Sequence, residues 1–244
     1  MIVFAPYARV IPRAALAGIL IVTAGRMIDW RGLVYHVRAT RFDAAIVAVT
    51  AVSAVAISIE FCVLVGVFMS FMLTIPRAGR MLRTEFVVTP EGAIHERLPD
   101  DAVCGHILIF GLEGELFFGA ASALERHFEY IESRIDAQTR VVVLRMKRLR
   151  NPDAAGLTML EGFLERLTAR GVPLFMCGVR NRLYQTMKKT GLAARLGDHE
   201  VFLEQPVRQT STLQAIRKAH TLLKDPCPIC RRDITVGDNL YYVI

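Results

Sequence analysis

The sequence predicts a membrane α-helical segment of about three spans, followed by an α/β domain. Three observations support this prediction. Between residues 44 and 76 the one charged side chain is Glu60, and a water-soluble helix does not tolerate so long an apolar run. From residue 84 onward, acidic, basic and apolar residues alternate as in a soluble domain. Hydrophobic residues make up 53% of the 244-residue chain, which is high for one soluble domain and low for a protein made only of spans.

The positive charge is concentrated in the apolar part. The chain carries a formal charge of +7, and residues 1–83 contain nine arginines, no lysine and three acidic residues. These arginines flank the apolar stretches, as the cytoplasmic signals of membrane proteins do. The near-neutral remainder has no basic stripe, so we expect no nucleic acid among the partners. The expected location is the cell (inner) membrane, multi-pass, with the C-terminal domain in the cytoplasm.

We expect membrane helices at residues 10–28, 42–59 and 61–75. A single helix over residues 44–76 would be about 50 Å long, whereas the hydrocarbon core is about 30 Å thick. The chain must therefore fold back as a hairpin near Glu60, which puts the arginine-rich ends on the cytoplasmic side. Both arms are shorter than about 20 residues, and the first is rich in alanine and serine. This composition predicts close packing against other protein.

Glu60 is a candidate site residue because ionisable groups within membrane segments are often functional. Two interpretations compete. Glu60 is either a turn carboxylate at the outer membrane interface, which we favour, or a ligand for an ion or a proton.

The soluble part alternates two kinds of pattern. Apolar runs rich in β-branched residues predict strands at 106–112, 140–146, 172–177 and 200–203. Apolar residues spaced by three and four predict helices at 121–135, 157–167, 183–192 and 213–223. Strands that alternate with single helices predict an α/β domain whose crossover helices cover the sheet. The expected division is 1–83 for the membrane helices, 84–225 for the α/β domain and 226–244 for a C-terminal tail.

The sharpest local motif is Arg-Asn-Pro-Asp-Ala-Ala-Gly-Leu at residues 150–157. Pro152 ends strand pairing, and Asp153 can cap the following helix by accepting its free N–H groups. A plain helix start explains the motif. The alternative is an anion or partner site at the helix N-terminus, although Asp153 would repel an anion there.

This motif and its context resemble a known family. The order strand, Asn-Pro-Asp-Ala-Ala-Gly-Leu, helix, Arg-Gly-Val-Pro-Leu, strand and Lys-Thr-Gly-Leu resembles a STAS domain, the sulfate transporter and anti-sigma antagonist module. Residues 11–22, Thr50, residues 65–67 and Ser70 resemble the last helices of SulP-type inorganic anion permeases. Leu-Phe-Phe-Gly-Ala at residues 116–120 is similar to the permease-associated form of STAS. The resemblance covers roughly residues 10–224.

The resemblance implies the C-terminal part of a secondary transporter of inorganic anions, of the sulfate or bicarbonate class. The STAS domain would be its cytosolic regulatory or dimerisation module. The implied partners are the remaining permease helices or a second copy of the chain, with the inorganic anion in the complete transporter. Three spans lack the paired repeats of such permeases, so we expect no transport by the chain alone. The alternative is a free-standing membrane-anchored STAS protein that acts as a binding or scaffold module.

The resemblance also identifies a candidate site, the STAS loop with Asp153, Ala154 and Gly156. Anti-sigma antagonists carry a phosphorylatable Ser or Thr directly after this Asp. Here the position is Ala154, which has no hydroxyl. Regulation by phosphorylation at this position is therefore chemically excluded.

The remaining motifs do not indicate catalysis. The sequence has no Gly-rich phosphate loop, no Gly-x-Ser-x-Gly and no His-Glu-x-x-His, so we expect no enzyme and no catalytic residue. Its five cysteines are an odd number, which fits a reducing compartment. Cys227 and Cys230 have the spacing of half a zinc site. The tail has no second ligand pair, and His220, which could be a third ligand, is more easily interpreted as a residue of the terminal helix. We therefore favour a reduced dithiol or an unordered tail without cofactor, with zinc as the alternative.

Overall fold

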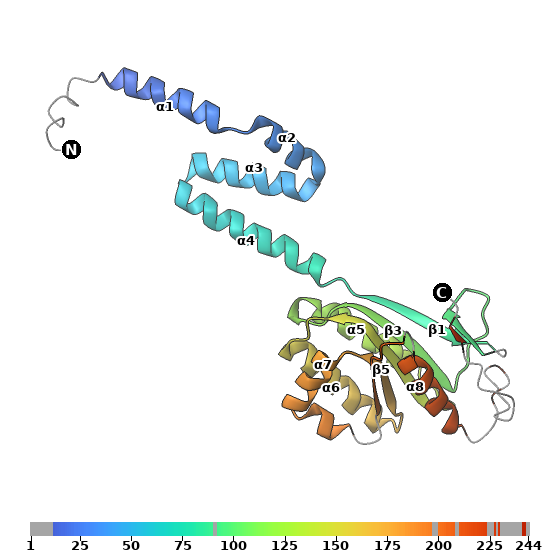
Figure 1. The fold of residues 1–244 in the computed structure, drawn as a ribbon. Helices are drawn as coiled ribbons and strands as arrows, with labels where there is room; N and C mark the ends of the chain where they lie inside the picture. Colours follow the sequence, from blue (N-terminus) through green and yellow to red (C-terminus); the bar gives the residue numbers. More distant parts are fainter. Residues whose placement is uncertain are drawn as a thin grey trace. The chain divides into compact units, whose positions relative to one another are not determined.

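The computed structural model describes residues 12–89, 92–196, 200–207, 210–223, 227, 229 and 241–242. The chain divides into two compact units, Met1–Leu73 and Thr74–Ile244. The described part of the first unit is helical (Figure 1), and its helices are α1 (Arg13–Met27), α2 (Trp30–Ala39), α3 (Arg41–Ala56) and α4 (Ile59–Ala78). The last five residues of α4 belong to the second unit.

Helices α3 and α4 form the hairpin that the apolar run requires. The turn is at Ile57 and Ser58, and the Ser58 hydroxyl oxygen accepts a hydrogen bond from the N–H of Phe61 at 3.2 Å. Farther along, a Cβ on Gly66 of α4 would lie 2.8 Å from the methyl group of Thr50 on α3. A small residue at this position therefore lets the two helices approach each other.

Only α4, among the helices that the structure describes, is long and apolar enough to cross a membrane. Helices α1 and α3 have 15 and 16 residues, fewer than the roughly 20 of a typical span, so the three spans stay a prediction. Helix α2 was not predicted. It is a short amphipathic helix whose first turn is capped by Asp29, which accepts from the N–H of Gly32 at 3.0 Å.

The first unit has almost no interior of its own. Over residues 12–73 as described, Ser53 is the one buried residue. Large apolar side chains are exposed instead, including Val55 at 91%, Ile59 at 75% and Ile21 at 73%. A water-soluble protein rarely exposes so extensive an apolar surface, so these helices need lipid or other protein around them.

The second unit is built on one mixed sheet of seven strands within the described residues, in the order β6-β5-β4-β3-β1-β2-β7. Its parallel part consists of β3 (Ile107–Glu115), β4 (Val141–Arg150), β5 (Leu174–Val179) and β6 (Glu200–Leu203). These are the four strands that the sequence predicts. The sheet is extended by β1 (Leu82–Val88), β2 (Ala93–Glu96) and β7 (Tyr241–Tyr242), which were not predicted. Strand β1 is antiparallel to both neighbours, and β7 runs parallel to β2.

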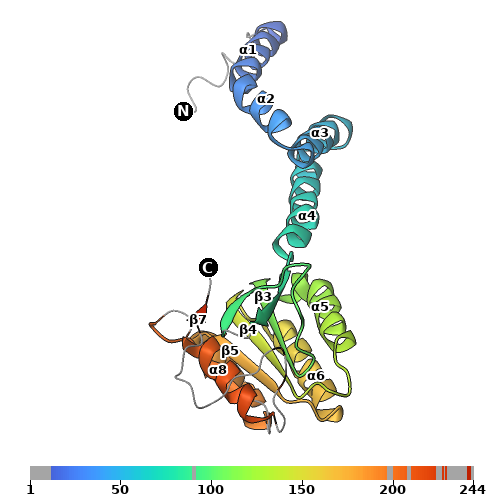
Figure 2. The same cartoon turned by 90° about the vertical axis from the view of Figure 1, so that its right-hand side faces the viewer.

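Helices cover both faces of this sheet (Figure 2). One face carries α5 (Ala121–Ser133), α6 (Ala154–Ala169) and α7 (Asn181–Lys189), and the other carries α8 (Thr210–Thr221). Two short 3₁₀ turns, η2 (Phe118–Ala120) and η3 (Leu192–Arg195), complete the connections.

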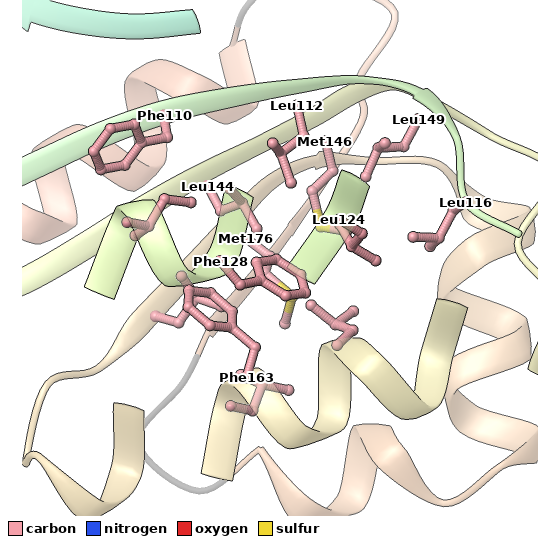
Figure 3. Close-up of a cluster of buried hydrophobic side chains, with 14 of the residues drawn as sticks. Phe110, Leu112, Leu116, Leu124, Phe128, Leu144, Met146, Leu149, Phe163 and Met176 are labelled. Carbon is pink, nitrogen blue, oxygen red and sulfur yellow. The ribbon is translucent and has the colours of Figure 1, made fainter. Parts of the chain in front are cut away.

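Each face has its own hydrophobic core. The larger one lies under α5, α6 and α7, where the rings of Phe128 and Phe163 stack with their centroids 4.1 Å apart (Figure 3). The second lies under α8 and includes Phe86 of β1, Ile216 of α8 and the thiols of three cysteines. The two cores explain why the domain needs helices on both sides of the sheet.

Candidate functional site

The candidate STAS loop lies at the N-terminus of α6, where Asp153 uses both carboxylate oxygens. Oδ1 accepts from the N–H of Gly156 at 2.8 Å, which is a helix N-cap. Oδ2 accepts from the N–H of Phe118 at 2.8 Å, across 35 residues of sequence. The predicted cap is therefore present, and the second bond, which the sequence did not indicate, fastens the start of α6 to η2.

Backbone pairing brings these two segments together. After β3, the N–H of Leu116 donates to the carbonyl of Arg150 at 2.8 Å, and the N–H of Asp153 donates to the carbonyl of Leu116 at 3.0 Å. Between them Asn151 adopts a positive φ of 46°, a conformation that asparagine tolerates better than most residues. Its side-chain amide donates to the carboxylate of Glu115. The loop is thus held at both ends.

Gly156 is buried because α6 passes directly over the end of β3. A Cβ at this position would lie 2.8 Å from both Cγ and the carbonyl oxygen of Leu116. Real Cβ atoms do not approach backbone oxygen so closely, so a larger residue would push α6 away from the sheet. Gly156 is a packing residue of the loop.

The exposed side of the loop carries no reactive group. Ala154 is exposed at the first turn of α6, at the position where the resembled antagonists carry a hydroxyl. Thr158, one turn later, is also exposed, and its hydroxyl donates to the carbonyl of Ala154 at 3.0 Å.

Glu60 lies in the first turn of α4, two residues after the hairpin turn, and its side chain is exposed. An acid in the first turn interacts favourably with the N-terminal end of the helix dipole. Its role as a turn carboxylate stays a prediction.

The structure places one cysteine of the predicted half zinc site next to two further potential metal ligands. Cys230 lies outside the described residues, and His220 lies in the last turn of α8, as expected. Cys227 is buried, and its Sγ is 3.5 Å from Sγ of Cys104. Together with His106 these two thiols form one group, in which one potential ligand atom of each residue lies within 4.8 Å of the others.

Sequence reasoning missed Cys104 and His106. The available signal was their Cys-x-His spacing at the start of a strand, but no feature of the sequence connects residues 104–106 with residue 227. Only the fold brings them together.

Comparison with known proteins agrees with the resemblance seen in the sequence. Residues 99–206 match the STAS domain family model, so the α/β unit contains a STAS domain. The chain is 24% identical over 202 residues to the "Putative sulfate transporter YvdB" of Bacillus subtilis, covering 83% of this chain and 36% of that protein. It is 26% identical over 192 residues to the bicarbonate transporter BicA of Synechocystis sp., covering 76% and 33% respectively.

A solved structure shows the same fold over most of the chain. The murine Solute Carrier 26 family member A9 anion transporter in the inward-facing state superposes with a TM-score of 0.63 at 16% identity. The match covers 81% of this chain and 31% of that transporter. The chain therefore spans about a third of the length of the relatives it matches. These relatives are transporters, which agrees with the expectation of a non-enzymatic protein.

Proposed function

We propose that this chain is the C-terminal part of a SulP-type secondary transporter of inorganic anions, with the STAS domain as its cytosolic regulatory or dimerisation module. The observation that carries the proposal is the direct succession of the two parts. Helix α4 ends at Ala78 and β1 begins at Leu82, while Met81 is already buried in the domain core. The similarity to transporters covers 76% to 83% of this chain, and so extends beyond the STAS domain into the exposed apolar helices, which supports the proposal.

Arginines support the orientation. Arg77, Arg80 and Arg83 follow the apolar part of α4, and positive residues next to a membrane helix stay on the cytoplasmic side. The STAS domain would then lie in the cytoplasm beneath the cell membrane. The hairpin turn beside Glu60 would lie on the outer side.

The end of α4 packs closely on the domain. A Cβ on Gly79 would clash with the carbonyl oxygen of Gly119 in η2, and one on Gly119 would lie 2.9 Å from a methyl carbon of Ile75. The neighbouring Phe118 N–H is the group that Asp153 binds. The STAS loop is therefore joined through η2 to the last turn of α4, and this contact is the proposed route by which the STAS domain regulates a permease.

The loop suits regulation by a protein contact. The exposed Ala154 has no hydroxyl, so a phosphate cannot be added there, and Asp153 is occupied by two backbone N–H groups. The partners that fit are the other helices of a permease or a second copy of the chain.

Transport itself needs more than this chain contains. Permeases of this type bind the anion near the midplane between paired repeats, at the N-termini of broken helices. The described hairpin offers a single carboxylate, Glu60, whose charge disfavours an anion. The anion, of the sulfate or bicarbonate class, would bind only in the complete transporter.

Reporter fusions test the orientation. Alkaline phosphatase is active outside the cytoplasm, so a fusion after Arg83 should be inactive and a fusion at Glu60 active. Matched fusions to a cytoplasmic reporter should give the reverse pattern. An active phosphatase after Arg83 would contradict the cytosolic STAS domain.

Reconstitution tests whether the chain transports an anion alone or associates with other permease helices. Purified chain in liposomes should give no sulfate or bicarbonate flux above the leak of empty vesicles, and it should copurify from membranes with co-expressed preceding helices of a SulP permease. A variant without residues 1–73 should lose that association. Saturable uptake by the chain alone, abolished by Glu60→Gln, would overturn the proposal. A complex formed only with a soluble protein would favour the alternative of a membrane-anchored scaffold protein.

A further inference from the structure

The group formed by Cys104, His106 and Cys227 has the composition and spacing of a metal site. Zinc binds thiolates at about 2.3 Å, and a tetrahedral angle then separates two sulfur ligands by about 3.8 Å. The two sulfur atoms here are 3.5 Å apart. That separation is near the zinc value and much longer than a disulfide bond of about 2.05 Å.

The group is also sheltered from water. Cys104 is 7% exposed and Cys227 is 3% exposed, and both belong to the core under α8. The Nδ1 atom of His106 is buried and has no hydrogen-bond partner among the described residues. A buried nitrogen without a partner is costly and needs an explanation. Coordination of a metal ion by Nδ1 would supply one.

The backbone around two of the ligands is held in place before any metal binds. The Thr139 hydroxyl donates to the carbonyl of Gly105 at 3.0 Å and accepts from the N–H of Asp136 at 3.1 Å. The carbonyl of His106 accepts from the N–H of Arg140 at 2.8 Å. The Cys104-Gly105-His106 segment is therefore fixed against the start of β4, which is the rigid support that a ligand pair requires.

The third ligand comes from the segment after α8, 123 residues later in the chain. Farther on, β7 pairs with β2 through Ala93 with Tyr241 and Ile94 with Tyr242. A two-residue strand is a weak attachment by itself. A metal bond at Cys227 would provide the strong attachment that keeps this end of the chain on the sheet.

We propose that Cys104, His106 and Cys227 bind one Zn²⁺ ion, which fastens the C-terminal tail to the STAS domain. Two thiolates and an imidazole suit zinc, whereas Mg²⁺ and Ca²⁺ prefer oxygen ligands. A structural zinc site has four ligands. The sequence predicts Cys230 as a ligand from its Cys-x-x-Cys spacing with Cys227, and this prediction falls outside the described residues.

The remaining cysteines provide controls. Cys177 lies in the same core, but burial raises the pKa of its thiol to about 11, and the thiol donates to the Thr212 hydroxyl at 3.6 Å. A thiol that stays protonated is a poor metal ligand. Cys62 lies in α4, outside the STAS unit.

The experiment measures metal in the full chain, purified in detergent without chelators. Mass spectrometry of the metal content should give about one zinc per chain, and Co²⁺ substitution should give the charge-transfer and d–d absorption of a tetrahedral thiolate site. Cys104→Ser and Cys227→Ser should each reduce zinc affinity by roughly tenfold or more. Cys62→Ser and Cys177→Ala should retain it. Wild-type chain that binds no zinc or cobalt would overturn the proposal.

Two further measurements separate metal binding from other causes. His106→Ala should lose zinc while its circular dichroism spectrum stays unchanged, because the variant removes one ligand and not the fold. Zinc affinity equal to that of the wild type in His106→Ala would contradict a role for His106. Cys230→Ser should remove one thiolate contribution from the cobalt spectrum, and an unchanged intensity would rule out Cys230 as fourth ligand. A Cys104–Cys227 disulfide would overturn the zinc site. It would be detected as two thiols that resist alkylation in denaturant with a chelator and react only after reduction.

Discussion

The carboxylate of Asp153 lies 2.8 Å from the backbone nitrogen of Phe118 and joins the start of α6 to the turn after β3. The same side chain caps α6 through Gly156. One residue thus stabilises a helix terminus and a tertiary contact. This arrangement explains why an aspartate, with two acceptor oxygens, occupies the position.

Replacing Asp153 with Asn separates the two roles. Asparagine still offers one oxygen for the N-cap but places an N–H₂ group where the second acceptor stands. We expect Asp153→Asn to cost about 1–2 kcal/mol of unfolding free energy, and Asp153→Ala to cost more, because it also removes the cap. Urea unfolding measures both, and equal costs for the two variants would contradict the second bond.

Gly156 and Gly162 lie on the same helix and should respond oppositely to alanine. At Gly156 the new Cβ would meet Leu116 at 2.8 Å, so Gly156→Ala should destabilise the domain by roughly 1–3 kcal/mol. At Gly162 the new Cβ would lie 3.5 Å from Nη1 of Arg166, which is an ordinary van der Waals contact. Gly162→Ala should therefore stabilise α6 by up to about 1 kcal/mol. Thermal melts measure the stability of both variants. A change in melting temperature of the same sign in both would contradict the close approach of α6 to β3.

His127 should make stability depend on pH. Burial lowers the pKa of its imidazole below the usual 6.5, and the charges of Arg83 and Arg126 lower it further, against a hydrogen bond to the Met81 carbonyl that raises it. Arg83 can only donate, so the ring accepts at Nδ1, 3.3 Å from the guanidinium, and donates at Nε2 to the Met81 carbonyl at 3.2 Å. That is the neutral form.

Because the unfolded chain binds a proton at His127 more readily than the folded chain, stability falls as pH falls from about 6.5 toward the lowered pKa. We expect melting temperatures measured between pH 7.5 and 5.5 to decline more steeply for the wild type than for His127→Gln. Parallel slopes would show that the imidazole titrates equally in both states.

Strands β1 and β2 define where an autonomous domain begins. Phe86, Val88 and Ile94 are buried in the core under α8, and β1 covers the edge of β3. A fragment of residues 100–224 lacks all three side chains, each worth about 1.5–3 kcal/mol when buried, and exposes a strand edge. A fragment of residues 80–244 should therefore unfold at higher urea concentration and aggregate less. Equal midpoints for the two fragments would mean that β1 and β2 add nothing to the fold.

Leu160 tests the burial predicted from helical spacing. Its side chain is 1% exposed in the core under α6. Leu160→Ala should cost about 2–5 kcal/mol, with the neighbouring exposed Thr158→Ala as a control of small effect. An unchanged melting transition for Leu160→Ala would place the core elsewhere.

The sequence by itself determined the elements whose burial pattern is local. A few neighbouring residues set each of three features. The helical spacing around Leu160 gave helix α6, and the apolar run gave strand β4. Pro152 ended the strand, and the structure has a loop there. The cap by Asp153 was predictable for the same reason, because the acceptor and its Gly156 N–H are three residues apart. Strand β1 was missed because its residues Arg83 and Glu85 interrupt the apolar pattern.

Tertiary structure alone decided the contacts between distant segments. The bond from Phe118 to Asp153 spans 35 residues, and the approach of Cys104 to Cys227 spans 123. Such pairs depend on which strands become neighbours in the sheet and on which face α8 packs, and both are set by the burial of the whole core. No residue-level periodicity encodes that choice. The Cys-x-x-Cys spacing of the tail therefore predicted only half a site, and the fold placed Cys104 and His106 beside Cys227.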